Sequence, residues 1–246
     1  MSHVLMMASF GLEIVECGGA IARALAAGDT VSAAVLMCRE ESKPQVRRAA
    51  AILGVDEVEF LDVPTGDVEF HGAHKRAVVE LVRRVKPDVM IMQDPEHAQH
   101  DLDPDRRVIA ILYAEALAVA GRDWRLEECG GHDPHPVPTM YYMTPETPNC
   151  VVEMGDTLPL KLRALAELSS QNSFSAESWL AHTTPEILRQ VIPAWNDDDL
   201  ETLGREGQQA FFTALALSHG LASHSGAVLG EPYRREGTFV MDRLTP

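Results

Sequence analysis

Residues 3–38 read HVLMMASFGLEIVECGGAIARALAAGDTVSAAVLMC, and they decide the fold because two apolar runs flank a helical pattern. The first run, residues 3–8, is nearly continuous, as expected for a strand that is buried on both faces. Residues 18–28 are rich in alanine and leucine and end with a glycine, which is typical of a helix and its stop signal. A second apolar run follows at residues 30–38. The stretch therefore predicts a strand, a helix and a second strand in series.

The same alternation of strand and helix continues along the chain to residue 121. Four such units predict a mostly parallel sheet with right-handed crossovers and helices on both faces, which is a doubly wound, Rossmann-like α/β fold. We expect one domain over residues 1–246, with residues 172–246 as a less regular helical part. The further segments that we expect are a helix that ends at Gly54, strands at 58–63 and 88–94, helices at 73–86 and 104–121, strands at 139–143 and 150–154, helices at 158–171 and 200–220, and an extended or looped return at 230–244.

The composition is that of a folded, acidic protein. The 246 residues include 37 Asp and Glu against 21 Lys and Arg, so the formal net charge is −16, and 46% of the residues are hydrophobic. These values exclude a wholly disordered chain. They also argue against a nucleic-acid partner or a membrane partner, because binding to nucleic acid or to anionic lipid needs a basic face.

Three features of the sequence bear on where the protein works. The chain lacks the run of about 18–20 apolar residues that spans a bilayer. No basic region precedes the first apolar run, so we expect no secretory signal. The four cysteines include no close C-x-x-C pair, which favours buried, reduced thiols in a domain of this size. We therefore expect a cytoplasmic protein.

Ligands of doubly wound sheets bind beyond the carboxyl ends of the strands. A nucleotide site of the Rossmann or P-loop type is disfavoured here, because neither of the glycine-rich patterns of those sites follows the first strand. The stretches that should surround the ligand are 9–19, 38–44, 64–74 and 94–107.

Several blocks of the chain, in their order and spacing, resemble the PIG-L/LmbE family of zinc-dependent N-deacetylases and related amidases. The resemblance covers roughly Val4 to Gln171. It implies the LmbE-like α/β fold, metal-assisted hydrolysis and, as relatives often self-associate, a homo-oligomer. The family also includes the 4-oxalomesaconate hydratase group. The blocks are ECGGAIARALAAGDTVSAAVLMC (16–38), RRAAAILGVDEVEFLDVPTG (47–66), VELVRRVKPDVMIMQDPE (79–96), DPDRRVIAILYAEAL (103–117) and DTLPLKLRALAELSSQ (156–171).

The first family motif follows strand 1 and reads A-H-P-D-D-E. The resemblance implies that its His and second Asp bind zinc and that its first Asp is the general base. Here residues 8–13 read ASFGLE, so Ser9 replaces the ligand His, Gly11 the base and Leu12 the ligand Asp. Leucine has no lone pair to give to a metal ion.

The second family motif, H-P-D-H, contributes a third zinc ligand with its final His. It aligns with the DPDR of residues 103–106, where Arg106 stands in place of that ligand. A guanidinium is permanently charged and would repel Zn²⁺. An alignment that slides His100 forward restores one ligand, but Leu12 still provides none. The sequence therefore predicts that the family's zinc site is absent.

One interpretation is a small-molecule enzyme with a remodelled site. Arg106 would bind a carboxylate or stabilise an oxyanion, while His100 and Asp105 transfer protons and Glu13 assists. The reaction would be that of a hydrolase or a hydratase/lyase on a polar, carboxylated and therefore anionic metabolite. The further candidates for substrate binding are Ser9, Asp103 and His97.

Two other interpretations remain open. A divalent metal could sit at a relocated site, because histidines pair at spacing i, i+3 in 71/74, 97/100 and 132/135. Alternatively, the chain is a non-catalytic homologue that only binds or completes an oligomer. Each of these residues also has a purely structural interpretation. The histidines could be exposed loop residues, Glu13 could interact with a helix N-terminus, and Ser9 could be a small residue that closes a strand. The segment 231–235 also resembles the family's closing segment near the pocket.

Overall fold

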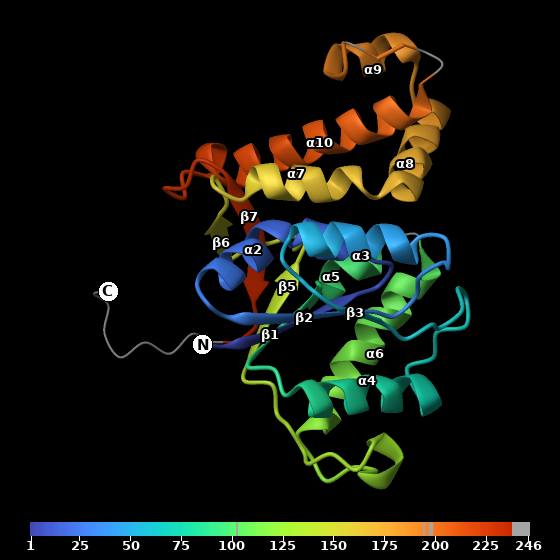
Figure 1. The fold of residues 1–246 in the computed structure, drawn as a ribbon, viewed down its shortest axis with the longest axis vertical. Helices are drawn as coiled ribbons and strands as arrows, with labels where there is room; N and C mark the ends of the chain where they lie inside the picture. Colours follow the sequence, from blue (N-terminus) through green and yellow to red (C-terminus); the bar gives the residue numbers. More distant parts are fainter. Residues whose placement is uncertain (102, 194, 197–198, 238–246) are drawn as a thin grey trace.

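In the computed structural model, residues 1–101, 103–193, 195–196 and 199–237 are described, and within them seven strands form one sheet. The strand order is β3-β2-β1-β4-β5-β7-β6 (Figure 1). The pairs β1–β2, β1–β4, β2–β3 and β4–β5 are parallel, and β7 pairs antiparallel with both β5 and β6. The strands are β1 (His3–Ala8), β2 (Thr30–Val35), β3 (Val58–Phe60), β4 (Val89–Gln93), β5 (Thr139–Met143), β6 (Cys150–Glu153) and β7 (Gly230–Arg235).

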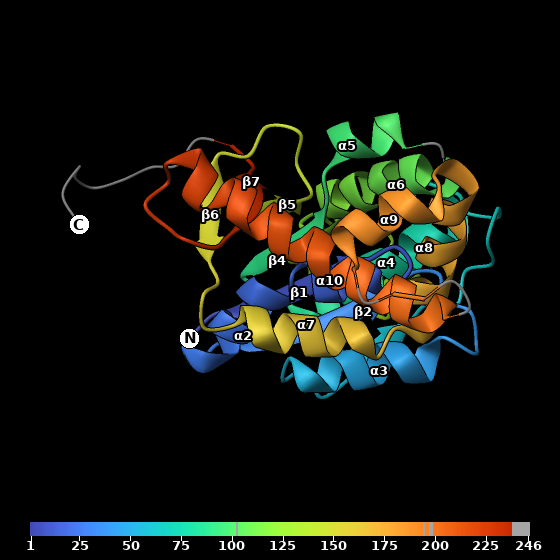
Figure 2. The ribbon, with the colours of Figure 1, turned by 90° about the horizontal axis from the view of Figure 1, so that it is seen from above.

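Helices cover both faces of this sheet, so the predicted doubly wound α/β fold is confirmed (Figure 1). Helices α2 and α3 pack on one face and α4 and α6 on the other, while α7 lies over α2 and α3, and α10 crosses over α7 as an outer layer (Figures 1 and 2). The described helices are α1 (Leu12–Glu16), α2 (Gly18–Ala26), α3 (Lys43–Ile52), α4 (Gly72–Val85), α5 (Pro95–His100), α6 (Pro104–Ala120), α7 (Leu158–Ala166), α8 (Ser169–His182), α9 (Pro185–Val191) and α10 (Leu200–His219).

Strand β1 shows why a continuous apolar run was needed. Met6 and Ala8 belong to the core under α2 and α3, whereas Leu5 and Met7 belong to the core under α4 and α6. Successive side chains of a strand point to opposite faces, so burial on both faces requires an apolar residue at every position.

Four segments differ from the sequence-based expectation. Short helices α1 and α5 occupy stretches where no helix was expected. The helix expected at 158–171 breaks at Leu168, where ψ is 58°. The side-chain amide of Asn172 donates to the Leu165 carbonyl at the end of α7 (3.2 Å). The return at 230–244 begins as β7, inserted between β5 and β6, and residues 238–244 lie outside the described residues.

The carboxyl ends of β1 and β4 define the place for a ligand. The two strands are neighbours, yet α2 follows β1 on one face and α6 follows β4 on the other face (Figure 1). A crevice forms where chain connections part in this way. Of the described helices, none has the length and apolarity needed to cross a membrane.

Candidate functional site

The turn after β1 is built around Gly11 and Glu13. Gly11 has φ 111°, and a Cβ added to it would lie 2.8 Å from Cγ2 of Val46, so a side chain at this position would be strained and crowded. The buried Glu13 carboxylate accepts hydrogen bonds from the backbone N–H groups of Phe10 (3.2 Å) and Gly11 (2.9 Å). Gly11, which the resemblance aligns with the family's base, has no side chain that could act as one, and Glu13 is fixed by the turn itself.

Arg106 lies at the same edge and is surrounded by partners. Its Nη1 is 3.3 Å from Oε1 of Glu13 and donates to Oε1 of Gln93 at 2.9 Å. Its Nε is 3.0 Å from Oδ2 of Asp101, and its guanidinium stacks 5.0 Å from the Phe10 ring centroid. Burial opposes the charge of Arg106, but Glu13 and the neighbouring carboxylates outweigh it and raise its pKa. Arg106 is a charged group already balanced by two carboxylates, and not the open anion anchor that the sequence suggested.

These residues do not fit the zinc ion of the family. Leu12 packs against the apolar core, and Arg106, which the resemblance aligns with the third ligand, is a cation paired with Glu13. The described residues also contain no cluster of three or more His, Cys, Asp or Glu side chains that could hold a metal ion, so the alternative of a relocated metal gains no support from them.

The acidic residues before α6 order the loop around them. Asp101 accepts from the N–H of Asp103 (2.8 Å), and Asp103 caps α6 by accepting from the N–H of Asp105 (2.8 Å). The buried Asp105 accepts through Oδ2 from the N–H of Gly66 (2.9 Å), which ties a second loop to this edge. Asp103 and Asp105 therefore hold backbone groups and do not line the cavity described next.

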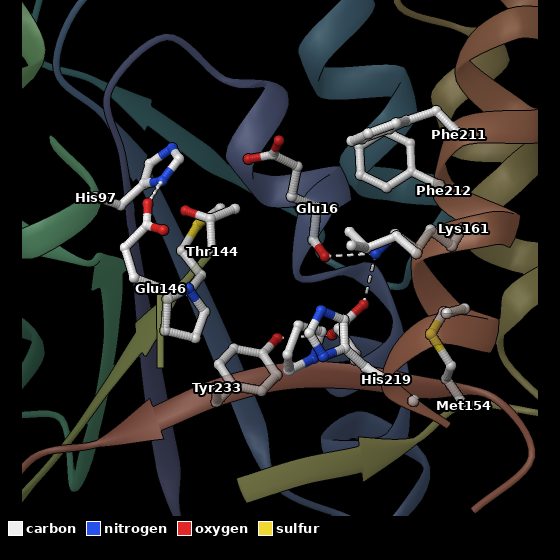
Figure 3. Close-up of a pocket in the computed structure, with 17 residues that line it drawn as sticks. Glu16, His97, Thr144, Glu146, Met154, Lys161, Phe211, Phe212, His219 and Tyr233 are labelled. Atoms are coloured by element: carbon white, nitrogen blue, oxygen red, sulfur yellow. Dashed lines mark hydrogen bonds and ion pairs between the residues drawn. The ribbon is translucent and has the colours of Figure 1, made fainter. Parts of the chain in front are cut away.

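A cavity of about 350 Å³ lies beside this edge, between α1, α7, α10 and β7 (Figure 3). His97 and Glu146 stand at one side, joined by a 2.8 Å contact, whereas Phe211 and Phe212 form an apolar wall on the other. Of the sequence-predicted residues, His97 is in the lining, but Ser9, Glu13, His100 and Arg106 are not. His100 is exposed on α5.

A buried ion pair closes one end of the cavity. Lys161 of α7 donates to Oε2 of Glu231 on β7 at 2.7 Å, and each side chain is only 4% exposed. The same carboxylate accepts from the N–H groups of Gly19 (3.0 Å) and Ala20 (2.9 Å) and from the Tyr233 hydroxyl (2.6 Å). Glu231 therefore joins α7, β7 and the N-terminus of α2, where a negative charge is favourable.

Glu16 projects its carboxyl group into the cavity from the end of α1 (Figure 3). Burial, and next the charge of Glu13, raise the pKa of Glu16 to about 7, although Arg106 and Lys161 act in the opposite direction. Among the described residues, no hydrogen bond or ion pair reaches the Glu16 carboxylate. Glu16 is therefore a cavity group that can exchange a proton near neutral pH.

Thr144 lines the cavity in an unusual conformation. Its φ is 48°, in the left-handed region that β-branched residues rarely adopt. Its buried Oγ1 has no hydrogen-bond partner among the described residues. Strain and an unsatisfied polar group at one cavity residue together mark a site that a ligand would complete.

Sequence reasoning missed Glu16, Thr144 and Lys161. Glu16 lies one helical turn after Glu13 in a largely apolar stretch, which was an available signal. In the sequence, Lys161 has the pattern of an ordinary polar position of an amphipathic helix. No feature of the neighbouring sequence indicates a functional role for Thr144. The resemblance of segment 231–235 to the family's closing segment did point to this place, because the segment lies in β7 and contributes to the cavity.

Comparisons with known proteins agree with this architecture. Residues 13–110 match the family model of GlcNAc-PI de-N-acetylase, PIG-L. The diacetylchitobiose deacetylase of Thermococcus kodakarensis is 29% identical over 135 residues, which cover 54% of this chain and 49% of that enzyme. The matched segment thus spans about half the length of this curated relative.

Solved structures share the fold over nearly the whole chain. The conserved protein TT1542 from Thermus thermophilus has a TM-score of 0.75 with 20% identity and covers 100% of both chains. The N,N'-diacetylchitobiose deacetylase from Pyrococcus horikoshii has a TM-score of 0.73 with 18% identity, over 95% of this chain and 83% of that one. The 4-carboxy-2-hydroxymuconate hydratase from Pseudomonas putida has a TM-score of 0.65 with 18% identity, over 100% of both.

At these identities the structural matches establish a common fold. The match to the family model covers residues 13–110, which run from α1 through strand β4 to the start of α6. The resemblance seen in the sequence is therefore confirmed: residues 13–110 match the PIG-L family model, within a chain that shares its α/β fold with solved deacetylases of this kind.

Proposed function

We propose that the chain is a small-molecule enzyme of the hydrolase or hydratase/lyase class that works without zinc at the family's ligand positions. The observation that supports this most is the Arg106 guanidinium, held by Glu13, Gln93 and Asp101 at the edge where the family binds its ion. A cavity of small-molecule size lies next to it. The Glu16 carboxyl group in that cavity supports a catalytic role over a purely structural one.

The charges around the cavity bear on the kind of substrate that it could bind. The lining contains the carboxyl groups of Glu16, Glu146 and Glu231 against the ammonium of Lys161, with His97 beside Glu146. This balance disfavours an anionic group in the cavity itself, so we propose a polar, uncharged reacting group. A substrate carboxylate, if present, would have to displace Asp101 from Arg106.

The reaction that suits these groups is the addition of water to an amide or to an activated double bond. Both additions need a group that accepts a proton from water and returns one, and neither requires the base of the deacetylases. The apolar wall of Phe211 and Phe212 would shield the reacting atoms from bulk water.

A turnover screen tests the proposal. The purified chain is incubated with N-acetylated sugars and other neutral amides, and separately with unsaturated hydroxy acids, with and without EDTA. We expect turnover in one of these classes at a rate that the chelator does not change. Loss of turnover with EDTA and recovery with Zn²⁺ would contradict the proposal. Thermal stabilisation by ligands without any turnover would favour the non-catalytic interpretation.

A further inference from the structure

Glu16 has a backbone position that is fixed from two sides. It is the last residue of α1, one helical turn after Glu13, whose carboxylate is bonded into the preceding turn. The Lys161 ammonium donates to the Glu16 backbone carbonyl at 2.5 Å. The backbone of Glu16 is therefore held in place, and its side chain points into the cavity (Figure 3).

Two ion pairs flank Glu16, and in each pair the cation already has another carboxylate as its partner. Arg106 faces Glu13, and Lys161 donates to Glu231. A third carboxylate between them is therefore destabilised in its ionised form by burial and by its neighbours' negative charge. The other ionisable groups that line the cavity are His97, Glu146, His219 and Tyr233.

Thr144 provides a second, independent mark of the same cavity. Its hydroxyl is buried without a partner among the described residues, and its backbone is held at φ 48°. A left-handed threonine costs of the order of 1–2 kcal/mol. The fold keeps this residue where a ligand can accept from or donate to its hydroxyl.

We propose that Glu16 is the general acid–base residue of this cavity and that the Thr144 hydroxyl holds the substrate beside it. The inference rests on the proposed function. The Glu16 carboxylate takes a proton from water as the water oxygen bonds to the substrate carbon. The resulting carboxylic acid then returns the proton. In an amide the proton goes to the leaving nitrogen as the C–N bond breaks, and in an activated double bond it goes to the carbon that receives the electron pair.

The first test needs no substrate. Carbon-13 NMR follows the glutamate side-chain carboxyls of the full chain as pH is raised, and Glu16→Gln assigns the signal. The matched control is Glu41→Gln, an exposed residue far from the cavity lining. We expect one midpoint near 7 that disappears in Glu16→Gln and persists in Glu41→Gln. Glutamate midpoints that all lie close to the usual value of about 4.3 would overturn the proposal.

The second test uses whichever substrate the wild type turns over. We expect Glu16→Gln to lower kcat by about 10²–10⁴-fold with little change in KM, and Thr144→Val to raise KM far more than it lowers kcat. Unchanged turnover in a folded Glu16→Gln variant would contradict the inference but would not affect the proposed function. A wild type that turns over nothing would instead remove the proposed function, while the titration still reports on Glu16.

Discussion

Replacing Lys161 by methionine should lower the stability of the whole protein, because it leaves a buried carboxylate without its counter-charge. Lys161 and Glu231 are each 4% exposed and lie 2.7 Å apart. Breaking a pair as buried as this costs about 3–5 kcal/mol. In a chain of this length each kcal/mol corresponds to about 2–4 °C, so the Tm should fall by about 6–20 °C.

An exposed pair provides the matched control. Arg84 and Glu59 are also 2.7 Å apart, but their side chains are 43% and 40% exposed. Glu59→Gln should therefore cost less than about 1 kcal/mol. Urea unfolding of both variants measures the two free energies, and similar losses for Lys161→Met and Glu59→Gln would refute the reasoning.

The double variant separates the ion pair from the packing. Glu231 also accepts from Tyr233 and from two N–H groups of α2, so Glu231→Gln keeps a side chain of the same shape among these donors. Adding it to Lys161→Met should recover part of the loss, because no unpaired charge remains. A coupling free energy of about 0.5–3 kcal/mol is expected, and strict additivity of the two losses would contradict it.

Four further predictions concern the turn after β1, two residues near or in the cavity, and the dependence of stability on pH. Gly11→Asp, which restores the family's base, should destabilise the chain by about 1–3 kcal/mol because of the positive φ and the contact with Val46, as thermal unfolding would show; no loss would contradict this. Thr144→Gly should stabilise the fold by about 1 kcal/mol while weakening ligand binding, both measurable by thermal shift; a loss of stability would argue against strain. Arg106→Met should move the Glu16 titration midpoint above 7, because Arg106 lowers that pKa. The stability of the wild type should fall as pH rises from 4.5 to about 7, since the folded chain then binds more protons at Glu16 than the unfolded chain; Glu16→Gln should lack this fall in urea titrations at each pH.

The strands of the sheet could be predicted from the sequence because most of them are continuous apolar runs, as strands buried on both faces require. A run such as residues 3–8 permits no other placement once helices follow it, and the predicted element types agree with β1 to β6. For the turn after β1, the sequence predicts that Gly11 and Leu12 offer no group that could act as a base or a ligand. Local chemistry of this kind needs no tertiary information.

The cavity could not be predicted from the sequence, because segments that are distant along the chain build it. Glu231 meets Lys161 across 70 residues, and α10 supplies the apolar wall. The neutralisation of Arg106 also depends on tertiary placement, since Glu13 lies 93 residues away. Patterns within single elements reveal which residues are buried, but not which charges face one another.

The zinc content of the purified chain tests the central claim most directly. The protein is incubated with Zn²⁺, dialysed and measured by elemental analysis, in parallel with Ser9→His/Leu12→Asp/Arg106→His, which restores the three family donors. We predict well below one zinc per wild-type chain, because a leucine and a paired arginine occupy the ligand positions, and a clear gain in the restored variant. One firmly held zinc per wild-type chain, lost on Arg106→Ala, would contradict the claim.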